Sequence, residues 1–545
     1  ESDNQSNASA VVSNMGNSLY KSTISDQAGG IIPRGVKRKR EDENEGKRST
    51  TFDEKSELDT PKRKRIQSTS KYIYQTLFLN GENSDVTILA FGKNWNLHKL
   101  YLSQSPYFAS MFGGSWKETD MSTVELKITD ENIDETAFRI ALGSLYKDDV
   151  FLKPVQVIGV VAVATLLQLD GLIDQCTALM VDTLSASTVC VYYSTAQVYG
   201  LVQFKQECLY WLKRNLMLSQ ESNLLKDISM DLMKQLISSP DLCVYLVEMD
   251  IYTLLKKWIF LHHTSSWSGS IKDMQTDTQE FFKEKLKESE NCYLELEEGK
   301  PFIPVFECIR WQNVINCAAS IRMLESDKIL PTGWLQGMYE YSWKQLLQVE
   351  QGLDKGPQEL EEGVFDEQCT RCGRVLQKEG EYCWRWVGYS YGVDLLLSLN
   401  NRLLTLKRNS DPRSCLQSLS GQPKRYIYYR FAIYSFDVNG RSKFSKCVGL
   451  KKIHLGPNEE ELLLLLERDV QFPLHISFNV MLASPIANHC LPLLKVPSTP
   501  NVTTKGSQTE SIRISNISVT QNITRSRTKD FNESNPVSDV EPEHI

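Results

Sequence analysis

The pattern of apolar and polar residues separates a folded middle from two polar ends. Residues 1–70 are rich in Ser, Asn, Asp, Glu, Lys and Arg. Such a segment cannot bury enough apolar surface to offset the entropy of folding, so we expect it to be disordered. The chain becomes polar again, with many Ser, Thr and Asn, and we expect a second disordered tail over 488–545.

Residues 71–184 predict a unit that mixes strands and helices. SDVTILAFGKNWNLHK alternates apolar and polar residues around Gly92-Lys93-Asn94, which indicates a β-hairpin. KLYLSQSPYFASMF has apolar residues at helical spacing, and TVELKIT alternates again. The following segments are helical and largely apolar, but the best apolar run, 157–167, is about half the ~20 residues that a bilayer requires. We therefore expect a buried helix there.

The rest of the middle divides into a helical and a β-rich part. Over 185–350 apolar residues recur on one face of successive segments, which predicts stacked amphipathic helices with a polar insertion at about 264–290. Residues 351–368 are expected to form a linker. Residues 369–487 contain short β-like runs separated by Asn-Asn, Asn-Gly and Pro-rich turns, typical of an antiparallel β-sandwich. The predicted fold class is therefore multidomain α+β.

The composition excludes some functions. A net charge of −7 and a pI of about 5.7 make the chain a poor candidate for wrapping nucleic acid, and we expect no sequence-specific nucleic-acid partner. The stretch Arg425–Arg430, RYIYYR, can stack bases or form a cross-strand aromatic face, and a predicted strand favours the aromatic face. The 13 cysteines are scattered and lie mostly in apolar patterns, as reduced thiols of an intracellular protein do.

The catalytic motifs of common enzyme classes are missing. The sequence has no P-loop, H-E-x-x-H, G-x-S-x-G or Gly-rich dinucleotide turn, so we expect a non-catalytic protein without a cofactor. His98, at the end of a predicted strand, is either an active-site residue or, more commonly in proteins, a structural histidine with a hydrogen-bond partner.

Cys369 and Cys372 form a C-x-x-C pair, followed by Cys383, and this is half of a structural zinc site. The missing fourth ligand would have to come through the fold, and the candidates are Cys415, His454 and His475. The alternative is a tight turn with buried thiols. A redox role is less consistent with the sequence, because no thioredoxin-like βαβ pattern surrounds the pair.

Two basic clusters stand in the N-terminal tail. They consist of Lys37, Arg38, Lys39 and Arg40, and of Lys62, Arg63, Lys64 and Arg65. Such clusters predict nuclear import with importins as partners, and the alternative is a solvated tail. If Met15 is an initiator, Gly16 becomes N-terminal and a candidate for myristoylation, although Tyr20 stands where that motif has Ser or Thr.

The stretch MFGGSWKE follows a predicted helix and contains an unexpected tryptophan. We expect Gly113-Gly114 to end the helix by adopting a positive φ. Trp116, Lys117 and Glu118 then either present an aromatic anchor beside a carboxylate, as protein interfaces do, or Trp116 folds back over the core.

Several of these residues together resemble known families. Asp85 before the first strand, His98-Lys99 after the hairpin and the helix from Ser105 to Phe112 resemble the BTB/POZ domain, over 71–184. VYYSTAQVYGLVQFKQECLYWLKRNL and VEMDIYTLLKKWIF resemble the helical BACK domain, over 185–350. KYIYQTLFLNGENSDVTI, GGSWKE, LQLDGLIDQC, RCGR…EYCWRW and GVDLLL resemble the germ cell-less family over residues 71 to about 485.

This resemblance implies a substrate adaptor of a cullin-3 ubiquitin ligase. It implies a homodimer formed through BTB, a location at the nuclear envelope with peripheral membrane contact, and a role in germ-cell formation. Trp116-Lys117-Glu118 fits the apolar-x-Glu motif of cullin-3-binding BTB proteins, and Tyr146, expected on the loop after ALGSL, is a second contact candidate.

Many such adaptors recognise their substrates through kelch repeats, but this sequence does not show the kelch period. The substrate would therefore bind the β-rich part or a groove between helices. The alternative function is a nuclear-envelope scaffold or transcriptional co-repressor that uses the BTB dimer alone.

Overall fold

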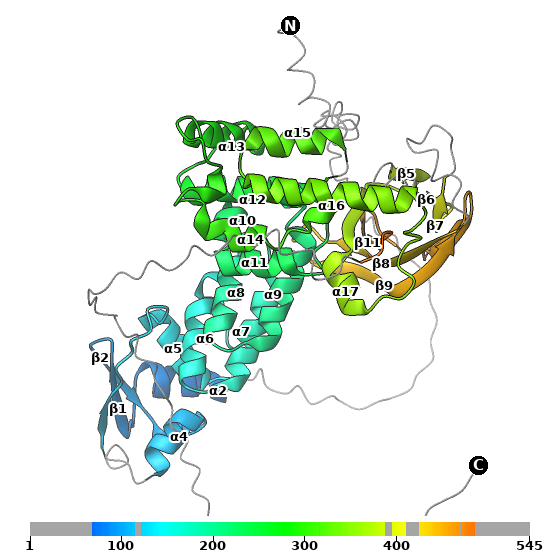
Figure 1. Cartoon of the computed structure of the whole chain (residues 1–545). Helices are drawn as coiled ribbons and strands as arrows, with labels where there is room; N and C mark the ends of the chain where they lie inside the picture. Colours follow the sequence, from blue (N-terminus) through cyan, green and yellow to red (C-terminus); the bar gives the residue numbers. More distant parts are fainter. Residues whose placement is uncertain are drawn as a thin grey trace, which may run out of the picture. The chain divides into compact units, whose positions relative to one another are not determined.

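The computed structural model describes residues 68–114, 121–219, 221–315, 317–386, 395–409, 424–467 and 470–485 (Figure 1). Apart from 68–70, both expected tails therefore lie outside the described residues. Within the described ranges, no helix combines the length and the apolar character that crossing a membrane requires.

The N-terminal unit has a small sheet packed with helices, as the sequence pattern predicts. β1 and β2 form the antiparallel hairpin, and β3 runs parallel to β1. The hairpin turns at Phe91 and Gly92, one residue earlier than expected, because Lys93 and Asn94 already pair with β1. The φ values of 55° and 69° at Phe91 and Gly92 fit the tight turn that joins twisted antiparallel strands. The elements are α2 (Thr69–Tyr72), η1 (Ile73–Leu79), β1 (Val86–Ala90), β2 (Lys93–Leu97), α3 (Lys99–Leu102), α4 (Pro106–Gly113), β3 (Thr123–Glu125), α5 (Glu135–Ser144), η3 (Pro154–Gln156), α6 (Val157–Leu166) and α7 (Asp170–Asp182).

The helix expected over HKLYLSQSPYFASMF is two helices, α3 and α4. The Ser105 hydroxyl accepts a hydrogen bond from the backbone N–H of Phe108, which makes Ser105 the N-cap of α4. Pro106 follows in the first turn, where its missing N–H does no harm. Ser105 also donates to the backbone carbonyl of Leu167 at 2.5 Å, so the break between the two helices is anchored to the end of α6.

The next part is helical, as expected, from α8 to α16. α13 occupies the predicted polar insertion and buries only one face, with Met274 and Phe282. A single hydrophobic core runs from Phe78 to Met338 and thus joins these helices to the N-terminal unit. The elements are α8 (Val189–Val198), α9 (Val202–Asn215), α10 (Ser222–Asp227), α11 (Met230–Ser238), α12 (Met249–His263), α13 (Ile271–Lys285), η4 (Tyr293–Glu295), η5 (Lys300–Phe302), α14 (Ile303–Phe306), η6 (Trp311–Asn313), α15 (Ala318–Asp327) and α16 (Thr332–Glu350).

The β-rich part consists of two four-stranded antiparallel sheets, in agreement with the predicted sandwich. Their strand orders are β10-β7-β6-β5 and β4-β11-β8-β9. The inner faces of both sheets share a separate apolar core that includes Leu397, Leu404, Phe431 and Phe478. The strands are β4 (Thr370–Leu376), β5 (Tyr382–Trp386), β6 (Leu395–Asn400), β7 (Leu403–Arg408), β8 (Arg425–Phe436), β9 (Ser442–Leu455), β10 (Glu460–Leu465) and β11 (Leu474–Met481).

The segment 351–368, expected as a linker, is packed and partly helical. It contains α17 (Glu362–Gln368), and Phe365 is fully buried. Asp354 is 4% exposed, and its carboxylate accepts hydrogen bonds from the backbone N–H and the hydroxyl of Ser484. These contacts hold the segment against the residues that follow β11.

Candidate functional site

The exit from α4 leads toward the predicted cullin-binding motif. α4 ends at Gly113, and Gly114 is extended with a φ of −101°. The expectation of a positive φ at this glycine pair was therefore wrong, and the helix ends by a simple change to extended backbone. Trp116, Lys117 and Glu118 lie outside the described residues, so their role and the exposure of Trp116 stay predictions.

Tyr146 lies in the turn after α5, as expected, but its side chain is buried in the core and not presented to a partner. Its side chain is 3% exposed and stacks on Tyr101, with the ring centroids 4.4 Å apart. Its hydroxyl accepts a hydrogen bond from the backbone N–H of His98 at 3.0 Å, and burial raises the pKa of this hydroxyl well above its usual range. In this structure Tyr146 therefore serves packing, and its predicted contact with cullin-3 lacks an exposed surface.

His98 has a structural role in the same cluster. Its Nε2 lies 2.9 Å from the carbonyl of Glu82, and its Nδ1 lies 3.3 Å from the Tyr146 hydroxyl. Both ring nitrogens thus face hydrogen-bond partners, which agrees with the interpretation of a structural histidine.

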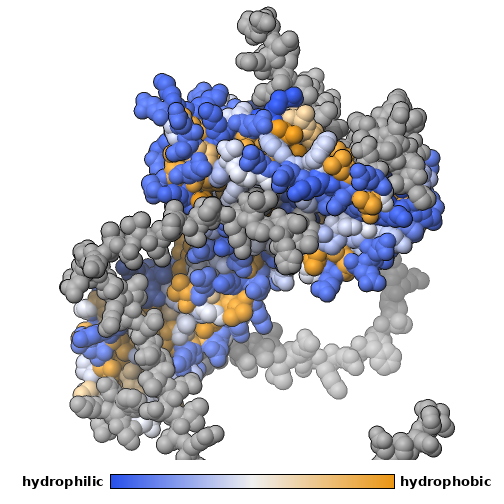
Figure 2. Space-filling model, viewed as in Figure 1, coloured by the Kyte–Doolittle hydropathy of each residue, from blue (hydrophilic) through white to orange (hydrophobic). Residues whose placement is uncertain are grey.

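Two exposed apolar residues lie between α5 and α6 and were not singled out from the sequence. Phe151 is 80% exposed and Val155 is 89% exposed. Both belong to the stretch VFLKPVQV, whose apolar residues look like the start of the buried helix α6. They could have been identified as surface residues only by placing them before that helix. Figure 2 shows hydrophobic residues reaching the surface elsewhere too, for example over α6–α8.

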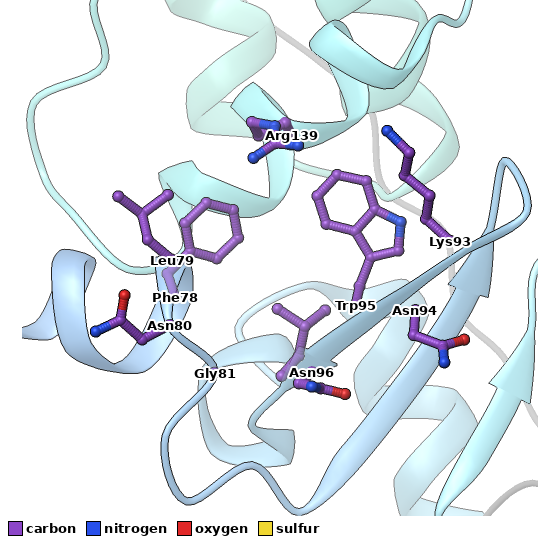
Figure 3. A pocket seen from close by; sticks show the side chains of 10 residues that line it. Phe78, Leu79, Asn80, Gly81, Lys93, Asn94, Trp95, Asn96 and Arg139 are labelled. Carbon is purple, nitrogen blue, oxygen red and sulfur yellow. The ribbon is translucent and has the colours of Figure 1, made fainter.

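A pocket of about 170 Å³ lies between η1 and β2 (Figure 3). The guanidinium of Arg139 stands 5.2 Å from the ring centroid of Trp95, and both line the pocket. Gly81 closes one side with a φ of 67°, and a Cβ there would lie 2.8 Å from the Cβ of Asn96. Sites for metabolites usually enclose about 300–1,000 Å³, so this pocket fits a single side chain better than a small-molecule substrate.

The C-x-x-C cysteines point into different surroundings. Cys372 lies in β4 and belongs to the core between the sheets, where its thiol donates to the carbonyl of Phe478 at 3.2 Å. Cys369 belongs to a separate cluster with Phe365, and its sulfur accepts a hydrogen bond from Arg310 at 3.0 Å. Burial raises the pKa of both thiols, which disfavours the thiolate that a metal binds.

The other candidate zinc ligands are not brought to this pair. Cys383 is exposed in the other sheet, on β5, where it accepts a hydrogen bond from Ser398. His454 stacks on Tyr426, and His475 is buried in β11. Cys415 lies outside the described residues, and within the described ranges no three His, Cys, Asp or Glu side chains form a group suited to a metal ion.

The stretch RYIYYR alternates between the two faces of β8. Arg425 is fully buried and donates to the carbonyls of Leu482 and Asp354 at 2.8 and 2.9 Å. Tyr429 packs in the core, while Tyr426 stacks on His454 with centroids 4.1 Å apart. This is the cross-strand aromatic arrangement that the sequence favoured over a surface for stacking bases.

The β-rich part is joined to the helices by specific polar contacts. The Trp211 indole donates to the carbonyl of Asn439, and the Asn215 amide donates to the carbonyl of Gly440, both at 2.9 Å. Elsewhere Arg371 of β4 and Glu248, the residue before α12, form an ion pair in which both side chains are fully buried. The sheet is thus held against the helical part at two separate places.

Comparison with known proteins places this architecture in a family. Residues 74–184 match the model of the BTB/POZ domain. Germ cell-less protein-like 1 of Homo sapiens is 48% identical over 430 residues, which cover 78% of this chain and 84% of that protein. The chain belongs to the germ cell-less family.

The likeness within the germ cell-less family extends beyond the BTB/POZ domain. Protein germ cell-less of Drosophila melanogaster is 35% identical over 459 residues, covering 79% of this chain and 80% of that protein. By contrast, Kelch-like protein 8 of Caenorhabditis elegans is 24% identical over 179 residues, covering 33% of this chain and 25% of that protein. The helical and β-rich parts are therefore shared with the germ cell-less relatives.

Proposed function

We propose that this chain is a non-catalytic adaptor of a cullin-3 ubiquitin ligase with a role in germ-cell formation. The observation that carries the proposal is the BTB/POZ match over 74–184, because domains of this kind commonly form homodimers and bind cullin-3. The names of the germ cell-less relatives support the germ-cell role. The helices from α8 to α16 would form a BACK domain, and the sandwich would hold the substrate.

The proposed cullin-binding surface is the chain that leaves α4. Trp116-Lys117-Glu118 begins three residues after Gly113, the last residue of α4. An exposed tryptophan beside a carboxylate has the character of an interface hot spot. Phe151 and Val155, exposed at 80% and 89%, are a second apolar element of the same domain that a partner can cover.

The test measures binding of purified cullin-3 to the whole chain. Truncating an interface hot spot costs about 2 kcal/mol or more, which corresponds to about 30-fold weaker binding for Trp116→Ala/Glu118→Ala. Phe151→Ala/Val155→Ala should weaken binding less. The matched control is Val438→Ala, since Val438 is fully exposed at the β8–β9 turn of the sandwich. Absence of cullin-3 binding by the wild type would refute the ligase proposal. Equal binding by a folded Trp116→Ala/Glu118→Ala variant would refute only the assignment of the binding site to these residues.

A second candidate is a nuclear-envelope scaffold or co-repressor without ligase function, favoured by the two basic clusters. Here import would depend on Lys37–Arg40 and Lys62–Arg65, and cullin-3 would be dispensable. Proximity labelling in cells that lack cullin-3 separates the two candidate functions. An unchanged set of nuclear-envelope and chromatin neighbours supports the scaffold. Accumulation of one labelled protein supports the ligase adaptor.

A further inference from the structure

β10 is an edge strand of the sandwich. It pairs with β7 on one side, and the strand order places no described strand on its other side. An edge strand presents unpaired backbone N–H and C=O groups along its free side, which is a template for a further strand.

A bulge in β10 brings two leucines onto the same outer face. In a regular strand, alternate residues face the same side, so Leu462 and Leu465 would point in opposite directions. The pairing with β7 shifts between Leu462 and Leu464. As a result, Leu463 is 5% exposed in the core, whereas Leu462 and Leu465 are 55% and 58% exposed.

A third leucine extends this apolar surface onto β7. Leu465 lies directly opposite Leu403, which is 39% exposed, and Leu462 lies opposite Thr405. Side chains that face each other across antiparallel strands have Cβ atoms about 4.5–5.5 Å apart. Leu403 and Leu465 are therefore neighbours, and Leu462 lies on the same outer face opposite Thr405; we call these three exposed leucines the β10 surface.

β9, an edge strand of the other sheet, is protected against the addition of a further strand. β9 carries Lys443, Lys446, Lys451 and Lys452 among its 14 residues. Lysines on an edge strand are a common protection against unwanted strand addition. β10 carries two glutamates at its start and a bulge, but no lysine or proline, and its remaining residues are leucines. We therefore expect the free edge from Leu462 to Leu465 to accept a partner more readily than β9 does.

Acidic residues border the β10 surface at both ends. Glu460 and Glu461 are exposed at the start of β10, and Glu467 follows it. Glu467 lies 3.0 Å from Lys446 but remains 64% exposed, and Arg402 donates to its backbone carbonyl at 3.0 Å. At the other end Lys407 lies opposite Glu460. The charge of this border favours a partner with Lys or Arg at its ends.

We infer that β10 binds an extended segment of a partner protein as an added strand. Backbone hydrogen bonds along the free edge would hold the segment, alternate apolar side chains would cover the β10 surface, and Lys or Arg at its ends would face Glu460, Glu461 and Glu467. Strand addition of this kind takes affinity from the backbone and specificity from alternate side chains. The inference goes beyond the cullin-3 proposal and holds whether or not the chain binds a cullin.

The first test uses the whole purified chain on an array of random ten-residue peptides. We expect the bound peptides to be enriched in apolar residues at alternate positions with Lys or Arg toward the ends. Leu462→Ser/Leu465→Ser should lower the signal at least 10-fold. The matched control, Leu100→Ser/Leu353→Ser, changes two leucines that are 79% and 74% exposed elsewhere and should leave the signal unchanged.

Charge reversal and backbone exchange complete the test. Glu460→Lys/Glu461→Lys should turn the preference toward peptides with acidic ends, and it keeps the inference testable if the serine variant fails to fold. Hydrogen exchange with a selected peptide should slow for amides of 460–465 and stay unchanged in β9. The inference would be overturned if no peptide bound, or if the bound peptides had apolar residues at helical spacing. It would also be overturned if the serine variant bound peptides equally well, or if the slowed amides lay away from β10. One further result would also overturn the inference: the wild type forms an assembly larger than a dimer, the serine variant does not, and no peptide binds. A second copy of the chain, and not a partner, would then occupy β10.

Discussion

Arg371 and Glu248, separated by 123 residues in the sequence, form a two-point ion pair in the fully buried boundary between β4 and the helices. The Nε of Arg371 donates to one carboxylate oxygen at 3.2 Å and its Nη2 donates to the other. Nη1 donates to the carbonyls of Ile237 and Ser239 at 2.8 and 3.0 Å, so the guanidinium is surrounded by acceptors. The pair therefore joins the sandwich to the helical part through charges that water does not reach.

Removing one member of this pair should destabilise the chain strongly. Glu248→Ala leaves a buried guanidinium without its counter-ion, for which about 3–5 kcal/mol is typical. Urea unfolding followed by tryptophan fluorescence measures the loss. The double variant Glu248→Leu/Arg371→Met should lose much less unfolding free energy than Glu248→Ala. The control is Lys285→Ala, which breaks an exposed pair with Glu298 and should cost less than about 1 kcal/mol. Equal losses for Glu248→Ala and Lys285→Ala would contradict the buried pair.

Tyr146→Phe should reduce stability and leave partner binding unchanged. The substitution removes the acceptor of the buried His98 N–H, and an unsatisfied buried group costs about 1–3 kcal/mol. Thermal unfolding measures the change, with Tyr210→Phe, at a 42% exposed position, as a control expected within about 0.5 kcal/mol. A variant of normal stability with weakened cullin-3 binding would instead favour the contact role first expected for Tyr146.

Gly373→Ala should prevent normal assembly of β4 against its neighbours. A Cβ at Gly373 would lie 2.1 Å from the carbonyl oxygen of Ile476 and 2.7 Å from that of Val244. Overpacking costs about 1–3 kcal/mol, and these obstacles are backbone atoms that cannot rotate away, so we expect the upper end or more. Gly449→Ala in β9 is the matched control, since a Cβ there would meet nothing within 4 Å apart from its own chain neighbours. It should be neutral or slightly stabilising. Soluble yield and thermal unfolding report both, and similar behaviour of the two variants would refute the steric argument.

Purified chain in reducing buffer should contain no stoichiometric zinc. Cys369 and Cys372 lie in separate clusters, and Cys383 lies in the other sheet. Elemental analysis measures the metal content, and the comparison is the Cys369→Ser/Cys372→Ser variant. One zinc per wild-type chain that the double variant lacks would restore the zinc hypothesis.

The elements that the sequence predicted well are those determined by neighbouring residues. Alternation from Asp85 to His98 identified the hairpin, and the leucine-rich strands of the sandwich were recognisable between their turns. The break between α3 and α4 was also present in the sequence, since Ser105-Pro106 is a helix-start pattern. It was missed because the apolar spacing continues across it.

Long-range contacts could not be predicted in the same way. The C-x-x-C motif drew attention to Cys369 and Cys372, although Arg371 between them makes the ion pair with Glu248. Once 370–376 is assigned as a strand, alternation places Cys372 and Arg371 on opposite faces, but their partners come from distant segments. The run LLLLL over 462–466 gave no indication of the bulge in β10 that exposes Leu462 and Leu465, because a bulge depends on pairing with β7.

His475 should make the stability of the chain fall as the pH is lowered. Burial lowers its pKa to about 4, and the ring packs against Tyr245 and Phe436 at the boundary between β11 and the helical part. The unfolded chain, with a histidine pKa of about 6.5, binds the proton more readily than the folded chain. The contribution of His475 to stability is therefore complete above about pH 6.5 and is lost as the pH falls through 4, about 3 kcal/mol in all.

The measurement is the difference in urea stability between wild type and His475→Gln at several pH values. The difference is needed because burial raises the pKa of Asp250 to about 6, and this group stabilises the fold on acidification, in the opposite sense. The advantage of the wild type over the variant should shrink between pH 6.5 and 4. A constant difference over that range would show that His475 keeps an ordinary pKa in the folded chain.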